Sequence, residues 1–174
     1  MNNKLINVCC LPDTSAISCI LSSQDNKLNI HEEERINSLR ILKEEINDFV
    51  ISALVIHELV LGLEEKYLKD DAFIIIMNYI KSYFNSLKIE PLGTKSLKKY
   101  REIYNENKFL NKDRAKHKVD ALIISNASSY AELNADRYSD FWFLTEDKTM
   151  LKYKVNNLKI YSLSDAVKAT GRLI

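Results

Sequence analysis

The chain has 174 residues, of which 46% are hydrophobic and 28% are charged. This length suffices for one compact domain with a buried core, and the composition argues against disorder. Lys and Arg total 25 against 24 for Asp and Glu. The net charge of +1 therefore gives no global sign of a nucleic-acid binder, and any basic surface must be local. We treat residues 1–174 as a single domain.

The cysteines and the apolar segments bear on the cellular compartment. Cys9 and Cys10 are adjacent, Cys19 makes the count odd, and no pair has zinc-site spacing. They are typical of small buried side chains in a reducing cytosol. The N-terminus lacks the features of a secretion signal, and the longest nearly apolar stretch, 50–63, is too short to span a bilayer. The sequence predicts a cytoplasmic protein without a membrane segment.

The first part of the chain predicts strands that alternate with helices. In chain order these elements are a buried strand over 5–11, a short helix from about residue 15, a polar loop over 22–29, a helix over 31–47, a strand over 49–53 and a helix through 58–62. The first strand is a continuous apolar run that ends at Pro12. The helix over 31–47 begins with three glutamates, which suit its N-terminal dipole.

The second part continues the alternation. It predicts a helix over 73–87, a strand over 87–92, a polar helix over 94–107, a helix over 119–134, strands over 141–144 and 158–161, and a small helix over 164–169. The helix over 73–87 is apolar nearly all round, which predicts either deep burial or a subunit contact. Together the elements predict an α/β fold with a mainly parallel sheet.

Four acidic residues lie where such a sheet places its ligands, beyond the carboxyl ends of its strands. They are Asp13, Glu58, Asp120 and Asp147, each beside the most apolar part of its own element. A lone carboxylate is costly to ionise in such surroundings, and a cluster would repel itself unless cations lay among its members. Oxygen-only ligands suit Mg²⁺ or Mn²⁺, and two such ions can support phosphodiester cleavage.

Each acid also has an alternative explanation when it is taken alone. Asp13 and a helix-opening Asp120 could each cap a helix, and Asp147 could be a solvated loop residue, as could Glu146. Glu58 is harder to explain structurally because its neighbours are apolar; it would act as a metal ligand or orient the attacking water. The order and context of all four favour a functional site.

Four short motifs in this order resemble those of the PIN-domain family, and particularly of the VapC-like toxins of toxin–antitoxin pairs. The motifs are Leu11-Pro12-Asp13-Thr14-Ser15, Glu58-Leu-Val-Leu-Gly62, Asp120-Ala-Leu-Ile-Ile-Ser-Asn-Ala127 and Thr145-Glu146-Asp147. The resemblance covers nearly the whole chain. The sequence departs from the family in two places. Pro12 stands where the family more often has an aliphatic residue. The segment 22–47 is somewhat longer than in compact toxins, and the elements there usually help to bind antitoxin.

The resemblance implies a fold, an activity and partners. The fold is a three-layer α/β/α sandwich, PIN-like, with a five-stranded sheet ordered 3-2-1-4-5. The activity is a ribonuclease dependent on Mg²⁺ or Mn²⁺, with Asp13, Glu58, Asp120 and Asp147 as catalytic and metal-binding residues. The partners are an RNA substrate, a second copy in a homodimer and a cognate antitoxin protein. The alternative is a catalytically inactive PIN-fold binding or regulatory module.

Basic residues gather before Asp120. Residues 95–118 hold nine Lys and Arg against three Asp and Glu, a net charge of +6. A solvated helix face is the preferred explanation for 98–108. For the four that lead directly into Asp120, phosphate binding is an equal alternative; these are Lys112, Arg114, Lys116 and Lys118. Thr145 could orient water or phosphate through its hydroxyl group, or form a turn hydrogen bond.

Several other classes are disfavoured by particular residues. A zinc protease motif would need a second histidine where the chain has Leu61, and glycines only at 62, 93 and 171 leave no phosphate-binding glycine loop. A phospho-acceptor receiver domain would need an acid pair that residues 7–12 lack. His31 and His117 stand among charged residues, and we expect both to be exposed.

Overall fold

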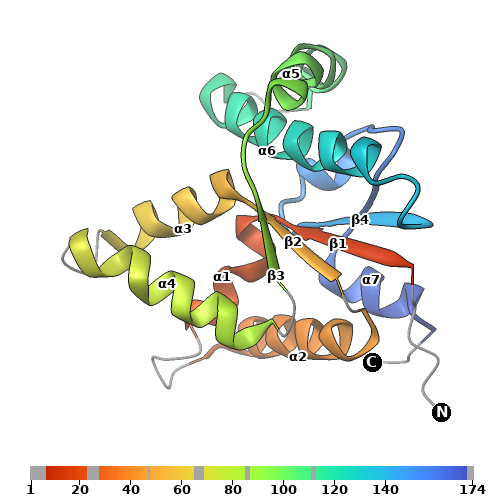
Figure 1. Cartoon of the computed structure of the whole chain (residues 1–174). Helices are drawn as coiled ribbons and strands as arrows, with labels where there is room; N and C mark the ends of the chain where they lie inside the picture. The colour runs from red at the N-terminus through yellow and green to blue at the C-terminus, as the bar shows by residue number, and fades with distance from the viewer. Residues whose placement is uncertain are drawn as a thin grey trace.

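A computed structural model describes residues 7–22, 28–46, 48–64, 69–84, 87–110 and 113–171 (Figure 1). Its elements are β1 (Val8–Pro12), α1 (Thr14–Ser22), α2 (Ile30–Glu45), β2 (Asp48–Ser52), α3 (Ala53–Glu64), α4 (Lys69–Tyr83), β3 (Leu87–Glu90), α5 (Thr94–Asn107), α6 (Arg114–Leu133), β4 (Asp140–Leu144), the 3-10 helix η1 (Met150–Lys152), β5 (Lys159–Tyr161) and α7 (Leu163–Ala169). None of the described helices is both long and apolar enough to cross a membrane.

The five strands form one sheet in the order β3-β2-β1-β4-β5, which confirms the predicted order. Every pairing in it is parallel. The central strand β1 pairs with β2 on one side and with β4 on the other, with Cys9 opposite Asp48 and Phe141. All five residues of β1 are buried, as expected for a strand covered on both faces.

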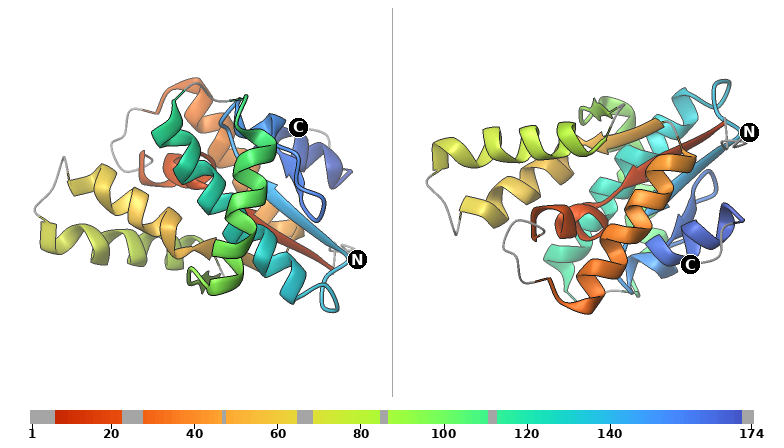
Figure 2. Two further views of the ribbon diagram at one scale, coloured as in Figure 1. Left: turned by 90° about the horizontal axis from the view of Figure 1, so that it is seen from above. Right: turned by 90° about the horizontal axis from the view of Figure 1, so that it is seen from below.

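Helices cover both faces of the sheet (Figures 1 and 2). Helices α5 and α6 pack against each other on one face, whereas α1, α2 and α7 lie on the other. Helices α3 and α4 pack against each other and against α1. The fold is therefore the predicted three-layer α/β/α sandwich. This arrangement brings the carboxyl ends of β1 and β4, the start of α3 and the first turns of α6 to one edge of the sheet.

The three cysteines are free and buried, as predicted. Burial raises the pKa of the Cys9 thiol to about 12 and that of Cys19 to about 11. Because the thiolate is the reactive form of cysteine, these side chains act as small apolar core residues.

Helix α6 begins earlier than the apolar pattern predicts, at Arg114 instead of residue 119. Asp113 is its N-cap, and the Asp113 carboxylate accepts hydrogen bonds from the amides of Ala115 at 2.9 Å and Lys116 at 3.2 Å. The first turn has few apolar side chains, so hydrophobic periodicity does not reveal it. Asp120 is thus the seventh residue of the helix, and the prediction that it opens or caps a helix is wrong.

Helix α4 is less buried than its composition predicts. Ile76 and Ile80 are buried, but Phe73 is 55% exposed and Ile74 is 57% exposed. The prediction of deep burial all round is therefore wrong for the first half of this helix. The other alternative, a subunit contact, stays a prediction.

Candidate active site

Asp13 follows β1 directly and is only 4% exposed. Its Oδ1 accepts hydrogen bonds from the Ser15 hydroxyl at 2.8 Å and the Ala16 amide at 2.9 Å. Its Oδ2 accepts one from the Thr145 hydroxyl at 2.6 Å. The bond to Ala16 is the bond of a helix N-cap, so Oδ1 caps α1 as the structural alternative predicted.

Burial affects the ionisation of this carboxyl group. Desolvation raises the pKa of Asp13 to about 6, although the hydrogen bonds from Thr145, Ala16 and Ser15 act in the opposite direction. The negative charge of Asp147 adds to the increase. Asp13 and Asp147 are therefore close enough to repel each other.

Thr145 joins the ends of β1 and β4. Its hydroxyl group is fully buried, donates to Asp13 and accepts a hydrogen bond from the Asp147 amide at 3.0 Å. The backbone continues the same link, since the Asp13 amide donates to the Leu144 carbonyl at 2.9 Å. The bond to the Asp147 amide is the predicted turn hydrogen bond, and the hydroxyl faces a carboxylate instead of solvent.

Asp147 receives hydrogen bonds at both carboxylate oxygens. Oδ1 accepts from the amides of Thr149 at 2.7 Å and Met150 at 3.2 Å, where η1 begins. Oδ2 forms an ion pair with the Lys116 ammonium group. Partial burial alone would raise the pKa of Asp147, but the bonds from Lys116, Thr149 and Met150 outweigh it and lower the pKa. Asp147 is therefore ionised at neutral pH.

Asp120 is 6% exposed and lies one helical turn after Lys116, on the same face of α6. The pKa of Lys116 is raised first by its hydrogen bond to Asp147 and further by the charges of Asp147 and Asp120. Burial raises the pKa of Tyr153 above its ordinary value, and the charges of Asp120 and Asp147 add to this. The negative charges of Asp120 and Asp147 therefore both raise the pKa values of Lys116 and Tyr153.

Glu58 lies in the second turn of α3, the helix that follows β2. Its Oε2 accepts a hydrogen bond from the hydroxyl group of Thr14, the residue next to Asp13. Glu58 is half-buried, unlike the apolar residues Ile56 and Leu59 beside it. This bond fixes the carboxylate against the junction of β1 and α1.

The four predicted acids therefore lie at one edge of the sheet, and the structure connects them through pairs of residues. Asp13 and Asp147 share Thr145, Glu58 is bound to Thr14, and Asp120 lies beside the Lys116 bound to Asp147. In the described part of the chain, no three acidic, Cys or His side chains converge closely enough to hold a metal ion together.

The basic residues predicted to bind phosphate have different surroundings. Lys112 lies outside the described residues, and the side chain of Arg114 is not described. Lys116 is paired with Asp147, whereas Lys118 is exposed. On the preceding helix, Lys99 pairs with Glu132 at 3.3 Å, as expected of a solvated face.

His117 contradicts the expectation that it is exposed, since only 1% of its surface is accessible. Its Nδ1 lies 2.5 Å from the Tyr153 hydroxyl and its Nε2 lies 3.0 Å from the Tyr104 carbonyl. The charged neighbours in sequence misled the prediction. The spacing of His117, Asp120 and Ile124 places all three on one face of α6, and this signal could have revealed the burial.

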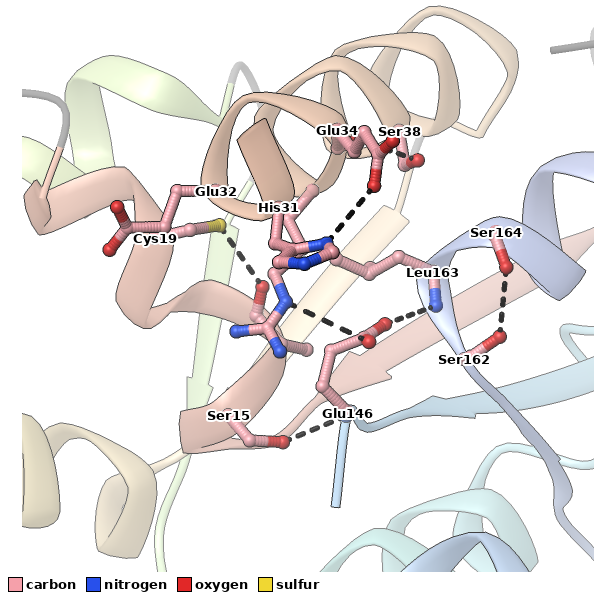
Figure 3. A network of polar contacts seen from close by, with 12 residues as sticks. Ser15, Cys19, His31, Glu32, Glu34, Ser38, Glu146, Ser162, Leu163 and Ser164 are labelled. Atoms are coloured by element: carbon pink, nitrogen blue, oxygen red, sulfur yellow. Dashed lines mark hydrogen bonds and ion pairs between the residues drawn. The ribbon is translucent and has the colours of Figure 1, made fainter. Parts of the chain in front are cut away.

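Glu146 is not a solvated loop residue (Figure 3). Its amide donates to the Ser15 hydroxyl at 2.8 Å, and its Oε1 accepts from the Leu163 amide at 2.8 Å, at the start of α7. Its Oε2 lies 3.7 Å from the Arg35 guanidinium of α2. Sequence reasoning missed Ser15 and Glu146 as residues that hold the loop after β4 against three helices.

A parallel five-stranded α/β/α sandwich with acidic residues at the carboxyl edge of its sheet defines the class of this protein. The chain belongs to the PIN domain family, whose model matches residues 10–155. PIN domains are generally nucleases, and the VapC-like toxins of toxin–antitoxin pairs are among them.

Solved structures share the fold. DNA-bound VapBC from Salmonella typhimurium has a TM-score of 0.55 and 18% identity, covering 90% of this chain and 98% of that one. VapBC2 from Rickettsia felis bound to a promoter DNA fragment has a TM-score of 0.56 and 19% identity, with 89% and 98% covered. FitAB bound to an IR36 DNA fragment has a TM-score of 0.53 and 17% identity, with 88% and 94% covered. No curated protein matches the sequence.

Proposed function

We propose that the chain is a metal-dependent endoribonuclease that hydrolyses RNA phosphodiester bonds. The observation that carries this proposal is the environment of Asp13. Its carboxylate is buried and held by three hydrogen bonds, and it lies close to a second carboxylate, that of Asp147. A helix cap alone requires only Oδ1 and does not require a second acid nearby.

The residues at this edge fit Mg²⁺ or Mn²⁺. Their side chains offer oxygen atoms only, which hard cations prefer. A carboxylate has about four lone-pair positions, so the three hydrogen bonds to Asp13 leave room for a cation at Oδ2. No three described acids converge closely enough to hold an ion in this arrangement, so the side chains of Asp13, Asp120 and Asp147 would have to turn toward an ion that they held between them. That ion would supply charge stabilisation and an activated water molecule.

The other residues of the site orient these oxygens. Ser15, Ala16 and Thr145 fix the plane of the Asp13 carboxylate, so its lone pairs have one direction before any ion binds. Thr14 positions Glu58, which would complete the ligand set or orient the attacking water. Lys118 and Arg114, at the start of α6, would contact RNA phosphates beside the acids.

We also propose that the chain is the toxin of a toxin–antitoxin pair and forms a homodimer. The structural neighbours VapBC, VapBC2 and FitAB are toxin–antitoxin complexes, and the chain covers nearly all of the matched chains. The cognate antitoxin would be a separate protein. Co-expression with the neighbouring gene, followed by purification through a tag on one chain, tests for a stable complex.

A cleavage assay on single-stranded RNA tests the enzyme proposal against an inactive PIN-fold module. We expect cleavage in Mg²⁺ or Mn²⁺ that leaves 5′-phosphate and 3′-hydroxyl ends, and that stops in excess chelator. Asp13→Asn and Asp120→Asn should each abolish it, while Asp136→Asn, an exposed acid after α6, should cleave like wild type. Cleavage that survives chelator would exclude the metal-dependent mechanism.

A further inference from the structure

Lys116 brings a positive charge onto the acidic edge of the sheet. Its ammonium group forms an ion pair with Oδ2 of Asp147, and Asp120 lies one turn further along the same face of α6. The lysine lies in the first turn of α6, anchored by the cap at Asp113. Its charge is therefore held near two of the carboxylates that would bind metal.

We propose that Lys116 is a built-in competitor of the metal ion, and that the ion displaces the Lys116 ammonium group from Oδ2 of Asp147 when it binds. The inference rests on the proposed function, because it takes Asp147 as a metal ligand. Oδ1 of Asp147 is already engaged by the amides of Thr149 and Met150, at 2.7 and 3.2 Å. Oδ2 is therefore the oxygen for which the two cations compete.

The ammonium group and a divalent ion cannot share Oδ2 without close contact between two positive charges. Lys116 is able to leave, since its side chain is 51% exposed, whereas that of Asp147 is 17% exposed. Lysine also has a long flexible stem that reaches solvent easily. An ion pair with such an exposed partner is weak. The competition therefore lowers metal affinity without preventing binding.

The consequence is a site whose affinity for metal is set partly by its own lysine. When the ion is bound, the released ammonium group stays within a side chain's length of the acids, because the helix that carries it is fixed by its cap. Lys116 therefore acts indirectly: its positive charge lowers the affinity of the carboxylates for the metal ion.

Mn²⁺ binding by isothermal titration calorimetry tests the proposal on wild type and on Lys116→Met, which keeps most of the chain length and removes the charge. We expect Lys116→Met to bind Mn²⁺ about five- to tenfold more tightly, from the lost ion pair and the lost repulsion. Lys98→Met is the matched control. Lys98 is an exposed lysine on α5, outside the site, so its loss removes the same charge and should change the affinity by about twofold at most.

The outcomes separate this inference from the proposed function. An equal or weaker affinity in Lys116→Met would overturn the competition and leave the metal site in place. An equally tighter affinity in both lysine variants would mean that overall charge sets the affinity, which also overturns it. If neither wild type nor Lys116→Met binds Mn²⁺ while circular dichroism shows both folded, then the metal site is wrong and the competition with it.

Discussion

The hydroxyl group of Thr145 donates a 2.6 Å hydrogen bond to Oδ2 of Asp13, although the two residues are 132 positions apart in sequence. The same oxygen of Thr145 accepts a hydrogen bond from the Asp147 amide. One buried hydroxyl group therefore sets the position of two acids that follow neighbouring strands. Its role follows from the parallel pairing of β1 with β4, which brings their carboxyl ends together.

Thr145→Val should lower the free energy of unfolding by about 1–3 kcal/mol, because it leaves buried polar groups of Asp13 and Asp147 without their partner. Since the hydrogen bond from Thr145 lowers the pKa of Asp13, its loss should also raise that pKa further above 6. Urea denaturation measures the first effect, and carboxyl NMR titration measures the second. Thr145→Ser keeps the hydroxyl group and should change the pKa little. An unchanged pKa in Thr145→Val would show that the bond has no electrostatic effect.

The alternation of strands with helices and the location of the acids could be predicted because both depend on local contrasts, whereas the strand order followed from the resemblance to the PIN-domain family. Glu58 is a charged residue among apolar ones, and Asp13 ends an apolar strand, so each was recognisable without the tertiary structure. The role of Ser15 was not recognisable. Its hydroxyl group matters only because the Glu146 amide lies 2.8 Å away, after a separation of 131 residues.

The start of α6 is a second feature that the sequence could not predict. The first residues of this helix alternate basic side chains with others, and only the cap at Asp113 marks the helix before the apolar pattern begins. Lys116 therefore looked like one of several phosphate-binding residues. Its ion pair with Asp147 joins positions 31 residues apart, and no periodicity within a single helix could have indicated it.

The basic start of α6 should contribute to RNA binding through phosphate contacts. In Arg114→Ala with Lys118→Ala, we expect weaker binding at low salt and a salt dependence of log K reduced by about 0.7 for each lost contact with single-stranded RNA. Fluorescence anisotropy at several salt concentrations, in chelator to prevent cleavage, gives this slope. Lys98→Ala with Lys99→Ala on α5 removes the same charge and should leave the slope unchanged. Equal slopes in all three proteins would assign residues 114–118 to a solvated surface.

The buried pair of His117 and Tyr153 should stabilise the start of α6. The Tyr104 carbonyl can only accept, so Nε2 of His117 carries hydrogen and a neutral ring accepts at Nδ1 from the Tyr153 hydroxyl. His117→Phe should lower the free energy of unfolding by about 1–3 kcal/mol, since it leaves both partners unsatisfied. Tyr153→Phe should lower the free energy of unfolding less, because only Nδ1 of His117 loses its partner. The prediction fails if His117→Phe is as stable as wild type in urea denaturation.

The burial of Asp13 predicts how stability depends on pH. Its pKa is raised from 3.8 to about 6, so the folded protein holds this proton more tightly than the unfolded chain does. Stability from this group is therefore fully present below pH 4 and is lost as the pH rises through 6. At pH 7 and without metal, Asp13→Asn removes the buried charge and keeps a good helix cap. It should be more stable than wild type by on the order of 1–3 kcal/mol, and the difference should vanish near pH 4.

Mn²⁺ should reverse this order. An ion at the carboxylates stabilises wild type by mass action and raises its melting temperature, while Asp13→Asn should respond much less. Thermal melts of both proteins are compared in chelator at pH 4 and pH 7, and with Mn²⁺ at pH 7. If Asp13 acts only as the cap of α1, Mn²⁺ should change the melting temperatures of the two proteins equally. An Asp13→Asn protein that is destabilised in chelator and shows the wild-type response to Mn²⁺ would leave Asp13 as a cap and remove it from the metal site.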